Sequence, residues 1–156
     1  MFYSQIAIDS NIDNLSEVEK FIDEIMDKYN IDKQYYGIFS VPLIESAKNA
    51  IVHGNKNDIH KKVTICVQVK NKGLQCSVSD QGNGFDFESL MNKPIEQHST
   101  NGFLKIKSLC ENISFDNNGA TISYMQNIPV VQQRNSRIKL LQRENNTIVK
   151  TKILQK

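Results

Sequence analysis

The sequence predicts an α+β fold, a two-layer α/β sandwich in which a mixed, mostly antiparallel sheet is covered on one face by helices. Residues 62–79 alternate apolar and polar side chains on both sides of an Asn-Lys-Gly turn, as an antiparallel hairpin does. Two longer segments instead repeat apolar residues at helical spacing. With 156 residues, 39% of them hydrophobic and 23% charged, the chain has the size and composition of a single soluble domain.

Local signals set the expected element boundaries. Asn14 is positioned to cap the first helix, and Asn118-Gly119 is a typical hairpin turn. Pro42 fits only the first turn of the second helix, and Gly54 is a typical C-terminal stop. The expected elements are a strand at 2–8, a helix at 15–29, a helix at 40–53, strands at 62–70 and 74–79, a polar loop to about 101, a helix at 102–110, and strands at 113–115 and 120–125.

Charge divides the chain into two parts. Residues 131–156 hold seven Lys or Arg against one acid, so they carry +6 and the remaining 130 residues carry −4. We therefore predict a domain over 1–130 and a basic C-terminal extension over 131–156 whose role is open. A solvated tail is the simpler interpretation of the extension, and contact with an acidic partner or nucleic acid is the alternative.

Composition excludes several other classes of protein. The three cysteines, Cys66, Cys76 and Cys110, lack the spacing of zinc ligands, so we expect reduced thiols packed as small apolar side chains. No run approaches the roughly 18 apolar residues that a membrane span needs, and residues 1–10 do not look like a secretory signal. We expect a cytoplasmic protein that binds neither membrane nor nucleic acid directly.

One segment that packing alone does not explain is Glu45–Gly54, on the second expected helix. Glu45, Asn49 and His53 are spaced four apart, so they form a polar stripe beside the apolar one. The Asn49 carboxamide is an oxygen ligand of a kind that Mg²⁺ accepts, and a carboxylate one turn away suits a proton acceptor beside such an ion. An ordinary polar helix face is the simpler interpretation of this segment taken alone.

A second such segment, Asp80–Phe85, directly follows a predicted strand. Continuing the alternation of that strand puts Asp80 on the core side of the sheet, where a carboxylate must find a donor. Gly82 and Gly84 allow a ligand to approach the backbone closely. Because Asp and Gly are common in any turn, this segment too is weak evidence by itself.

Together and in this order, the two segments resemble the ATP-binding boxes of the histidine-kinase-like (Bergerat-fold) ATPase superfamily. Glu45–Gly54 matches the ExxxNAxxHG asparagine box, and Asp80–Phe85 matches the DxGxGF first glycine box. The resemblance covers about residues 2–128 and is greatest to the small bacterial anti-sigma-factor serine/threonine kinases. It implies the Bergerat ATP-binding fold, with ATP and Mg²⁺ as cofactors.

The resemblance also implies roles for individual residues. Asp80 would accept a hydrogen bond from the adenine amino group, and Gly82 and Gly84 would let the loop close over base and ribose. Asn49 would hold Mg²⁺ on the triphosphate. Glu45 would be the catalytic general base that takes the proton from an attacking hydroxyl.

The second glycine box departs from the family pattern GxGLxxI. Thr100 replaces the first glycine, and Gly102 keeps the second, where phosphate would lie against the amide groups that open the helix. His98 occupies the lid position that often holds an arginine. These departures affect phosphate transfer more than nucleotide binding. Lys105 could neutralise phosphate, but an ordinary surface lysine is the simpler interpretation, and Phe103 is expected to be a core residue.

The function that the resemblance implies is a protein-serine kinase in a partner-switching pathway. Such kinases bind a sigma factor and phosphorylate a small antagonist protein, and a homodimer is an analogy from the family. Three alternatives stay open: a nucleotide-binding module that transfers no phosphate, the ATP-binding part of a histidine kinase, and a structural domain with coincidental boxes. A histidine kinase would be expected to carry a helical hairpin with a phosphoacceptor histidine, which this sequence does not show. The joint match of the two boxes disfavours a structural domain with coincidental boxes.

Overall fold

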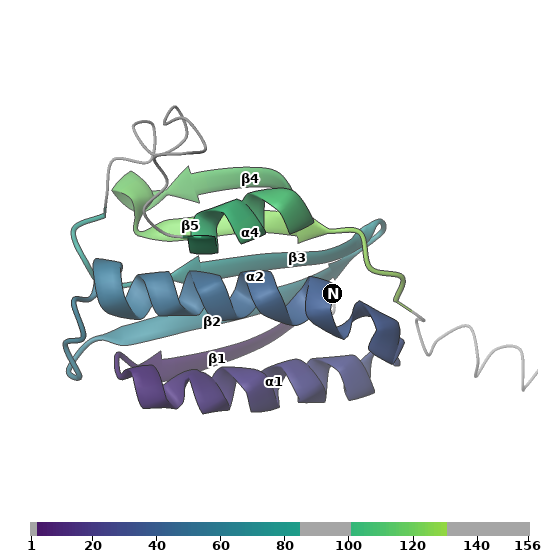
Figure 1. Cartoon of the computed structure of the whole chain (residues 1–156), viewed down its shortest axis with the longest axis horizontal. Helices are drawn as coiled ribbons and strands as arrows, with labels where there is room; N and C mark the ends of the chain where they lie inside the picture. The colour runs from purple at the N-terminus through teal and green to yellow at the C-terminus, as the bar shows by residue number, and fades with distance from the viewer. Residues whose placement is uncertain (1–2, 85–100, 131–156) are drawn as a thin grey trace, which may run out of the picture.

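The computed structural model describes residues 3–84 and 101–130, which form one antiparallel sheet with helices on a single face (Figure 1). The strands lie in the order β1-β2-β3-β5-β4, and every neighbouring pair is antiparallel. The strands are β1 (Tyr3–Asp9), β2 (Lys62–Lys70), β3 (Gly73–Ser79), β4 (Glu111–Asp116) and β5 (Thr121–Gln126). The predicted α+β sandwich is therefore confirmed, with pairing that is antiparallel throughout the described residues.

In the described residues, three α-helices lie side by side over the sheet (Figure 1). They are α1 (Leu15–Lys28), α2 (Tyr36–Asn49) and α4 (Asn101–Leu109). One turn of π-helix, η3 (Ala50–Gly54), continues α2, and the shorter 3-10 turns are η1 (Ile12–Asn14), η2 (Lys33–Tyr35) and η5 (Asn117–Gly119). The basic extension predicted at 131–156 lies outside the described residues.

Between the two layers, the apolar faces of the helices and strands form one core. The predicted alternation of β2 is confirmed, because Val63, Ile65 and Val67 are fully buried. Helices α1 and α2 cover them with residues at helical spacing. Full burial of one such side chain stabilises the fold by roughly 1.5–3 kcal/mol. The buried residues of the two helices are Val18, Phe21, Ile22, Ile25, Met26, Phe39, Leu43 and Ala47.

The start of α2 differs from the prediction. The helix begins at Tyr36, so Pro42 stands inside it, and the prediction of a first-turn proline is wrong. A proline inside a helix leaves the carbonyl four residues earlier, here that of Ile38, without its N–H partner. The fully buried side chain of Gln126 on β5 donates from Nε2 to this carbonyl. A strand distant in sequence therefore supplies the bond that the proline cannot make.

Two smaller predictions have different outcomes. Asn14 precedes α1 but makes no capping bond: its backbone is already helical because η1 leads into α1, and its side chain donates to the Asp9 carbonyl, 3.1 Å away. The Asn118-Gly119 turn is confirmed, with Asn118 at a φ of 56°. The other elements end within about two residues of their predicted limits, the usual uncertainty of helix and strand ends.

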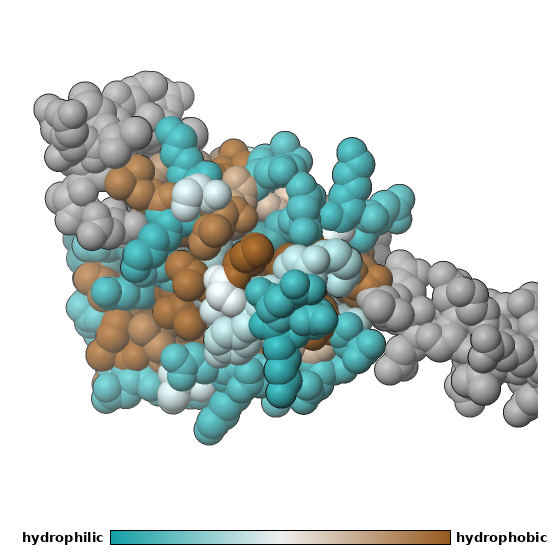
Figure 2. All heavy atoms as spheres, turned by 45° about the vertical axis from the view of Figure 1, so that its right-hand side comes forward, coloured by the Kyte–Doolittle hydropathy of each residue, from teal (hydrophilic) through white to brown (hydrophobic). Residues whose placement is uncertain are grey.

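The visible face and the three thiols of the described residues have ordinary features of a folded domain. Figure 2 shows apolar residues between polar ones on the face that it presents, and scattered exposed apolar residues are normal. All three cysteines are free, as predicted, and burial raises the pKa of the Cys110 thiol to about 12. Within residues 3–84 and 101–130, no helix is long and apolar enough to cross a membrane.

Candidate functional site

A cavity of about 60 Å³ lies where α2 and η3 face β3, β5 and α4. Asn49 and Asp80, one from each segment singled out in the sequence, both line it. The fold thus brings the two segments to one place, as the predicted pattern requires. The other lining residues are Ser46, Ala50, His53, Gly54, Val78, Phe103, Ile106, Phe115, Gly119, Ala120 and Ile122.

Asp80 follows β3 and continues its core-facing alternation, as predicted, so its half-buried carboxyl group reaches the cavity. The Gly82 N–H donates to Asp80 Oδ1 at 2.8 Å, and the Asp80 N–H donates to the Ala120 carbonyl at 2.9 Å. Burial raises the pKa of Asp80, while the Gly82 N–H and the charge of Lys61 partly offset this. The group is therefore a fixed acceptor in surroundings that disfavour its charge.

The end of η3 and the glycine-rich loop touch through their backbones. A Cβ atom on Gly54 would lie 2.3 Å from Asp80 Cγ, and one on Gly82 would lie 2.1 Å from the Gly54 carbonyl oxygen. Only glycine allows so close an approach at either position. Gly54 thus does more than end a helix, because it makes room for the carboxylate of Asp80.

The polar stripe formed by Glu45, Asn49 and His53 contacts two different parts of the structure, the cavity and helix α4. Asn49 is half-buried and His53 exposed, and both line the cavity. Glu45, one turn earlier, instead meets α4, where Lys105 Nζ lies 2.5 Å from its Oε1. A Cβ on Gly102, at the start of α4, would lie 2.6 Å from Glu45 Oε2. Glu45, the predicted general base, and the start of α4, the predicted phosphate-binding helix end, are therefore adjacent.

Sequence reasoning missed two residues of this region. Ser46 is buried and lines the cavity, and its hydroxyl lies close to the buried hydroxyl of Tyr124. A hydroxyl at an apolar position of the helical stripe was the available signal. Lys105 was read as a surface lysine, and although half-exposed it forms the ion pair with Glu45.

Of the remaining predicted residues, Phe103 and Gly84 lie in the described part of the chain. Phe103 is a core residue as predicted, with its ring centroid 6.1 Å from that of Phe115. Gly84 is described at the end of the first glycine box and has a φ of 78°. Thr100 and His98 lie outside the described residues.

A larger hollow, of about 780 Å³, lies between the end of α1 and the start of α2. Its lining includes Asp23, Asp27 and Asp32, which outnumber the lysine Lys33. Carboxylates at such a site repel an anionic ligand such as a triphosphate. Charge therefore favours the smaller cavity at Asp80 as the site for a nucleotide.

Fold and cavity together define the class as an α+β domain with a cavity between its helices and its sheet. A family model, described as the histidine kinase-like ATPase domain, matches residues 8–125, which include both boxes. The chain therefore belongs to the histidine kinase-like ATPase domain family, and this membership supports ATP binding. Comparison with curated proteins finds no matching relative.

The residues at the cavity fit the adenine end of ATP. Apolar walls from Val78, Phe103 and Ile106 adjoin polar side chains, which include the Asp80 carboxylate and the Ser46 hydroxyl. This combination is typical of small-molecule pockets.

Magnesium would depend on the bound nucleotide. In the described part of the chain, no group of three or more His, Cys, Asp or Glu side chains is arranged to hold a metal ion. The Asn49 carboxamide at the cavity offers one neutral oxygen ligand. Since Mg²⁺ is commonly held by few protein groups together with phosphates and water, this single ligand fits the ion.

Proposed function

We propose that this chain binds ATP with Mg²⁺ at the Asp80 cavity and acts as a cytoplasmic protein-serine kinase of the anti-sigma-factor type. Its partners would be regulatory proteins of a partner-switching pathway, an antagonist protein, a sigma factor or both, and a homodimer would be its oligomeric form. The observation that carries the nucleotide part is the placement of the Asp80 carboxylate. It is half-buried, fixed at Oδ1 by the Gly82 N–H, and lines an apolar cavity.

The base end recognises adenine in this proposal. A carboxylate accepts a hydrogen bond from the adenine amino group, whereas the oxygen at that position of guanine would face it with a second acceptor. The raised pKa of Asp80 reflects a desolvated group, for which a charge-assisted bond to a ligand is worth more than in water. The site should therefore prefer ATP to GTP.

At the phosphate end, the chain's own residues supply positioning and proton transfer. The first turn of α4, at Gly102, presents N–H groups and the positive end of the helix dipole, which favour anions. Glu45 lies against this turn and would take the proton from a serine hydroxyl. Asn49 is the residue that would hold Mg²⁺, and the ion would neutralise phosphate charge.

A second candidate function is a nucleotide-binding module that transfers no phosphate. The observation that favours it is the ion pair between Lys105 and Glu45, which occupies the proposed base. Thr100, in place of a glycine of the second box, supports the same alternative from the sequence. The two functions share the base end and differ only in whether Glu45 becomes available.

Calorimetry with ATP and GTP, each with and without Mg²⁺, tests the shared part. We expect ATP to bind more tightly than GTP and Mg²⁺ to strengthen ATP binding. No binding of ATP under either condition would contradict the proposal. Transfer of labelled γ-phosphate to serine on a candidate antagonist protein then separates the kinase from the module.

A further inference from the structure

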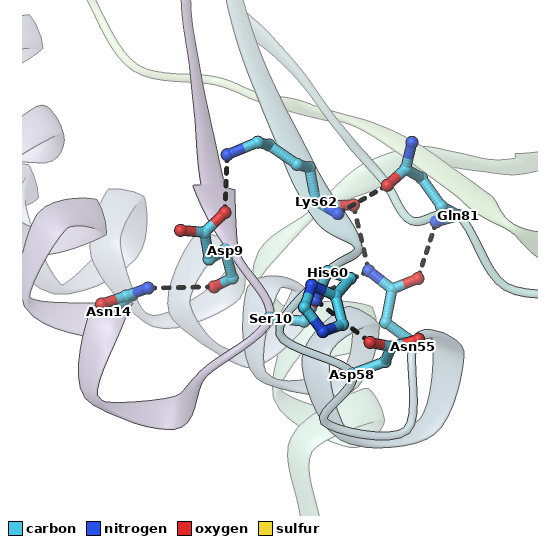
Figure 3. Close-up of polar contacts among 8 residues, drawn as sticks. All are labelled: Asp9, Ser10, Asn14, Asn55, Asp58, His60, Lys62 and Gln81. Atoms are coloured by element: carbon cyan, nitrogen blue, oxygen red, sulfur yellow. Dashed lines mark hydrogen bonds and ion pairs between the residues drawn. The ribbon is translucent and has the colours of Figure 1, made fainter.

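The side chain of Asn55 ties three separate segments together just beyond η3 (Figure 3). Its Nδ2 donates to Ser10 Oγ at 2.6 Å and to the Lys62 carbonyl at 3.0 Å. Its Oδ1 accepts from the Gln81 N–H at 2.8 Å. Asn55 is 1% exposed, so all three bonds start from a buried side chain whose loss would leave polar groups unpaired.

Gln81 is held twice. Besides its N–H bond to Asn55, its side-chain Oε1 accepts from the Lys62 N–H at 2.6 Å. Because Gln81 is exposed, water competes for this second hydrogen bond. The hydrogen bond to Asn55 is better protected from water, since the side-chain amide of Asn55 is buried. Of the two, the bond to Asn55 should contribute more to holding the loop.

A short chain of contacts leads from Asn55 to the cavity. Gln81 stands between Asp80 and Gly82, and the Gly82 N–H bonds to Asp80 Oδ1. Fixing the Gln81 peptide therefore fixes both the backbone that carries the carboxylate and the N–H that orients it. Lys62 and Ser10 anchor the other side of Asn55 to the start of β2 and the segment after β1.

We infer that Asn55 is a positioning residue for the nucleotide site, acting through Gln81 on the direction of the Asp80 carboxylate. This inference rests on the proposed function, since it takes Asp80 as the base-recognising group. The inference gives the oxygen and the nitrogen of the Asn55 side-chain amide different roles. The Oδ1 acceptor serves the site, and the Nδ2 donor serves the stability of the sheet edge.

Three variants separate these tasks. Asn55→Ala removes both halves, and we expect the Kd for ATP to rise about tenfold, as for the loss of one hydrogen bond. Asn55→Asp keeps an acceptor for the Gln81 N–H and loses the donors, so its Kd should stay within about threefold of the parent. Ser10→Ala, the matched control, weakens only the anchor and should leave the Kd unchanged while lowering the urea midpoint.

A selectivity readout distinguishes positioning from a general loss of stability. With the carboxylate less well oriented, Asn55→Ala should lower the ratio of ATP to GTP affinity, and Ser10→Ala should not. Amide hydrogen exchange in the parent adds a test that needs no variant to fold. The Gln81 N–H should be protected, and rapid exchange there would overturn the inference.

The outcomes also separate this inference from the proposed function. A parent that binds no ATP overturns both. If the parent binds ATP and Asp80→Asn weakens binding while Asn55→Ala does not, only the inference fails. Equal losses of affinity in Asn55→Ala and Asn55→Asp would likewise overturn it, because the retained acceptor would then have no effect.

Discussion

At the base end of the cavity, Asp80 is held through backbone bonds to Gly82 and Ala120, and the buried Asn55 holds the residue after it. At the phosphate end, Glu45 is held by a single ion pair with Lys105, whose side chain is 49% exposed. Bonds within a buried network contribute about 0.5–1.5 kcal/mol each, and breaking one leaves a costly unpaired group. A solvent-exposed ion pair contributes about 0.2–1 kcal/mol, but only the lysine of this pair is half exposed, since the Glu45 side chain is 16% exposed.

This difference suggests how the two ends would work with a ligand. The hydrogen bonds described above already fix Asp80. Under the proposed function, recognition of adenine would therefore need little local rearrangement of Asp80. At the phosphate end, phosphate would offer Lys105 another anion, and the largely buried Glu45 carboxylate would then lose its partner. Under the proposed function, nucleotide recognition would therefore be built into the fold, whereas transfer would depend on an exchange of partners between Glu45, Lys105 and phosphate.

The largest expected effect is on transfer and comes from Glu45→Gln. If Glu45 takes the proton from the serine hydroxyl, the variant should transfer phosphate about 10²–10⁴-fold more slowly. The Kd for ATP should stay within a few fold, because the substitution is nearly isosteric. Single-turnover transfer and calorimetry measure the two quantities, with the exposed Glu111→Gln as control.

Two results would change the interpretation of Glu45. A Glu45→Gln variant that transfers phosphate as fast as the parent would remove it from the role of base. A parent that binds ATP and transfers phosphate to no candidate partner would favour the non-catalytic module, with Glu45 paired to Lys105 as in the structure.

Asp80→Asn should have the next largest effect, and it acts on binding. Loss of a charge-assisted hydrogen bond costs about 1.5–3 kcal/mol, or one to two decades in ATP affinity. Calorimetry measures this directly, and Asp116→Asn is a control at an exposed carboxylate. ATP affinity equal to that of the parent would make Asp80 a structural acid.

The metal provides a third test. Asn49→Ala should remove the strengthening of ATP binding by Mg²⁺ and leave affinity due to the base, because its carboxamide is the proposed protein ligand. Titration of ATP over a range of Mg²⁺ concentrations shows the effect. An unchanged Mg²⁺ dependence would place the ion elsewhere.

Sequence reasoning predicted what local pattern determines. Strict alternation fixed β2 and the inward side of Asp80, since moving a strand by one residue reverses its faces. It missed interactions between distant residues. The Gln126 bond that supports Pro42 joins positions 88 apart, and the Glu45–Lys105 pair joins positions 60 apart. No local periodicity encodes such partners.

A smaller effect is expected at Lys105. Lys105→Met removes a cation beside Glu45, which then faces the triphosphate without its counter-charge, so ATP should bind a few fold more weakly at low salt. The difference from the parent should shrink as salt screens the charges. Lys107→Met, on the same helix and exposed, is the matched control. Equal ATP affinity of Lys105→Met and the parent at low salt would contradict this role.

The smallest effect concerns stability and pH, and it also comes from Asp80→Asn. Burial raises the pKa of Asp80 above its ordinary 3.8, so the folded state disfavours the ionised form. The stability that Asp80 contributes is present below pH 3.8 and is lost as the pH rises through the raised value. A neutral amide that keeps an acceptor for the Gly82 N–H avoids this loss. The variant should therefore be more stable than the parent at pH 7, by less than about 1 kcal/mol because the group is partly solvated.

Urea unfolding of both proteins between pH 7 and pH 4.5 measures this difference, which should narrow as the pH falls. Greater stability of the parent at pH 7 would mean that the charge of Lys61 outweighs burial and that the carboxylate stabilises the fold. A variant that gains stability while losing ATP affinity would show the opposite. The folded protein would then retain the unfavourable charge of Asp80 because ligand binding requires it. The regions at Asp80 and at Glu45 would therefore differ in function as well as in structure.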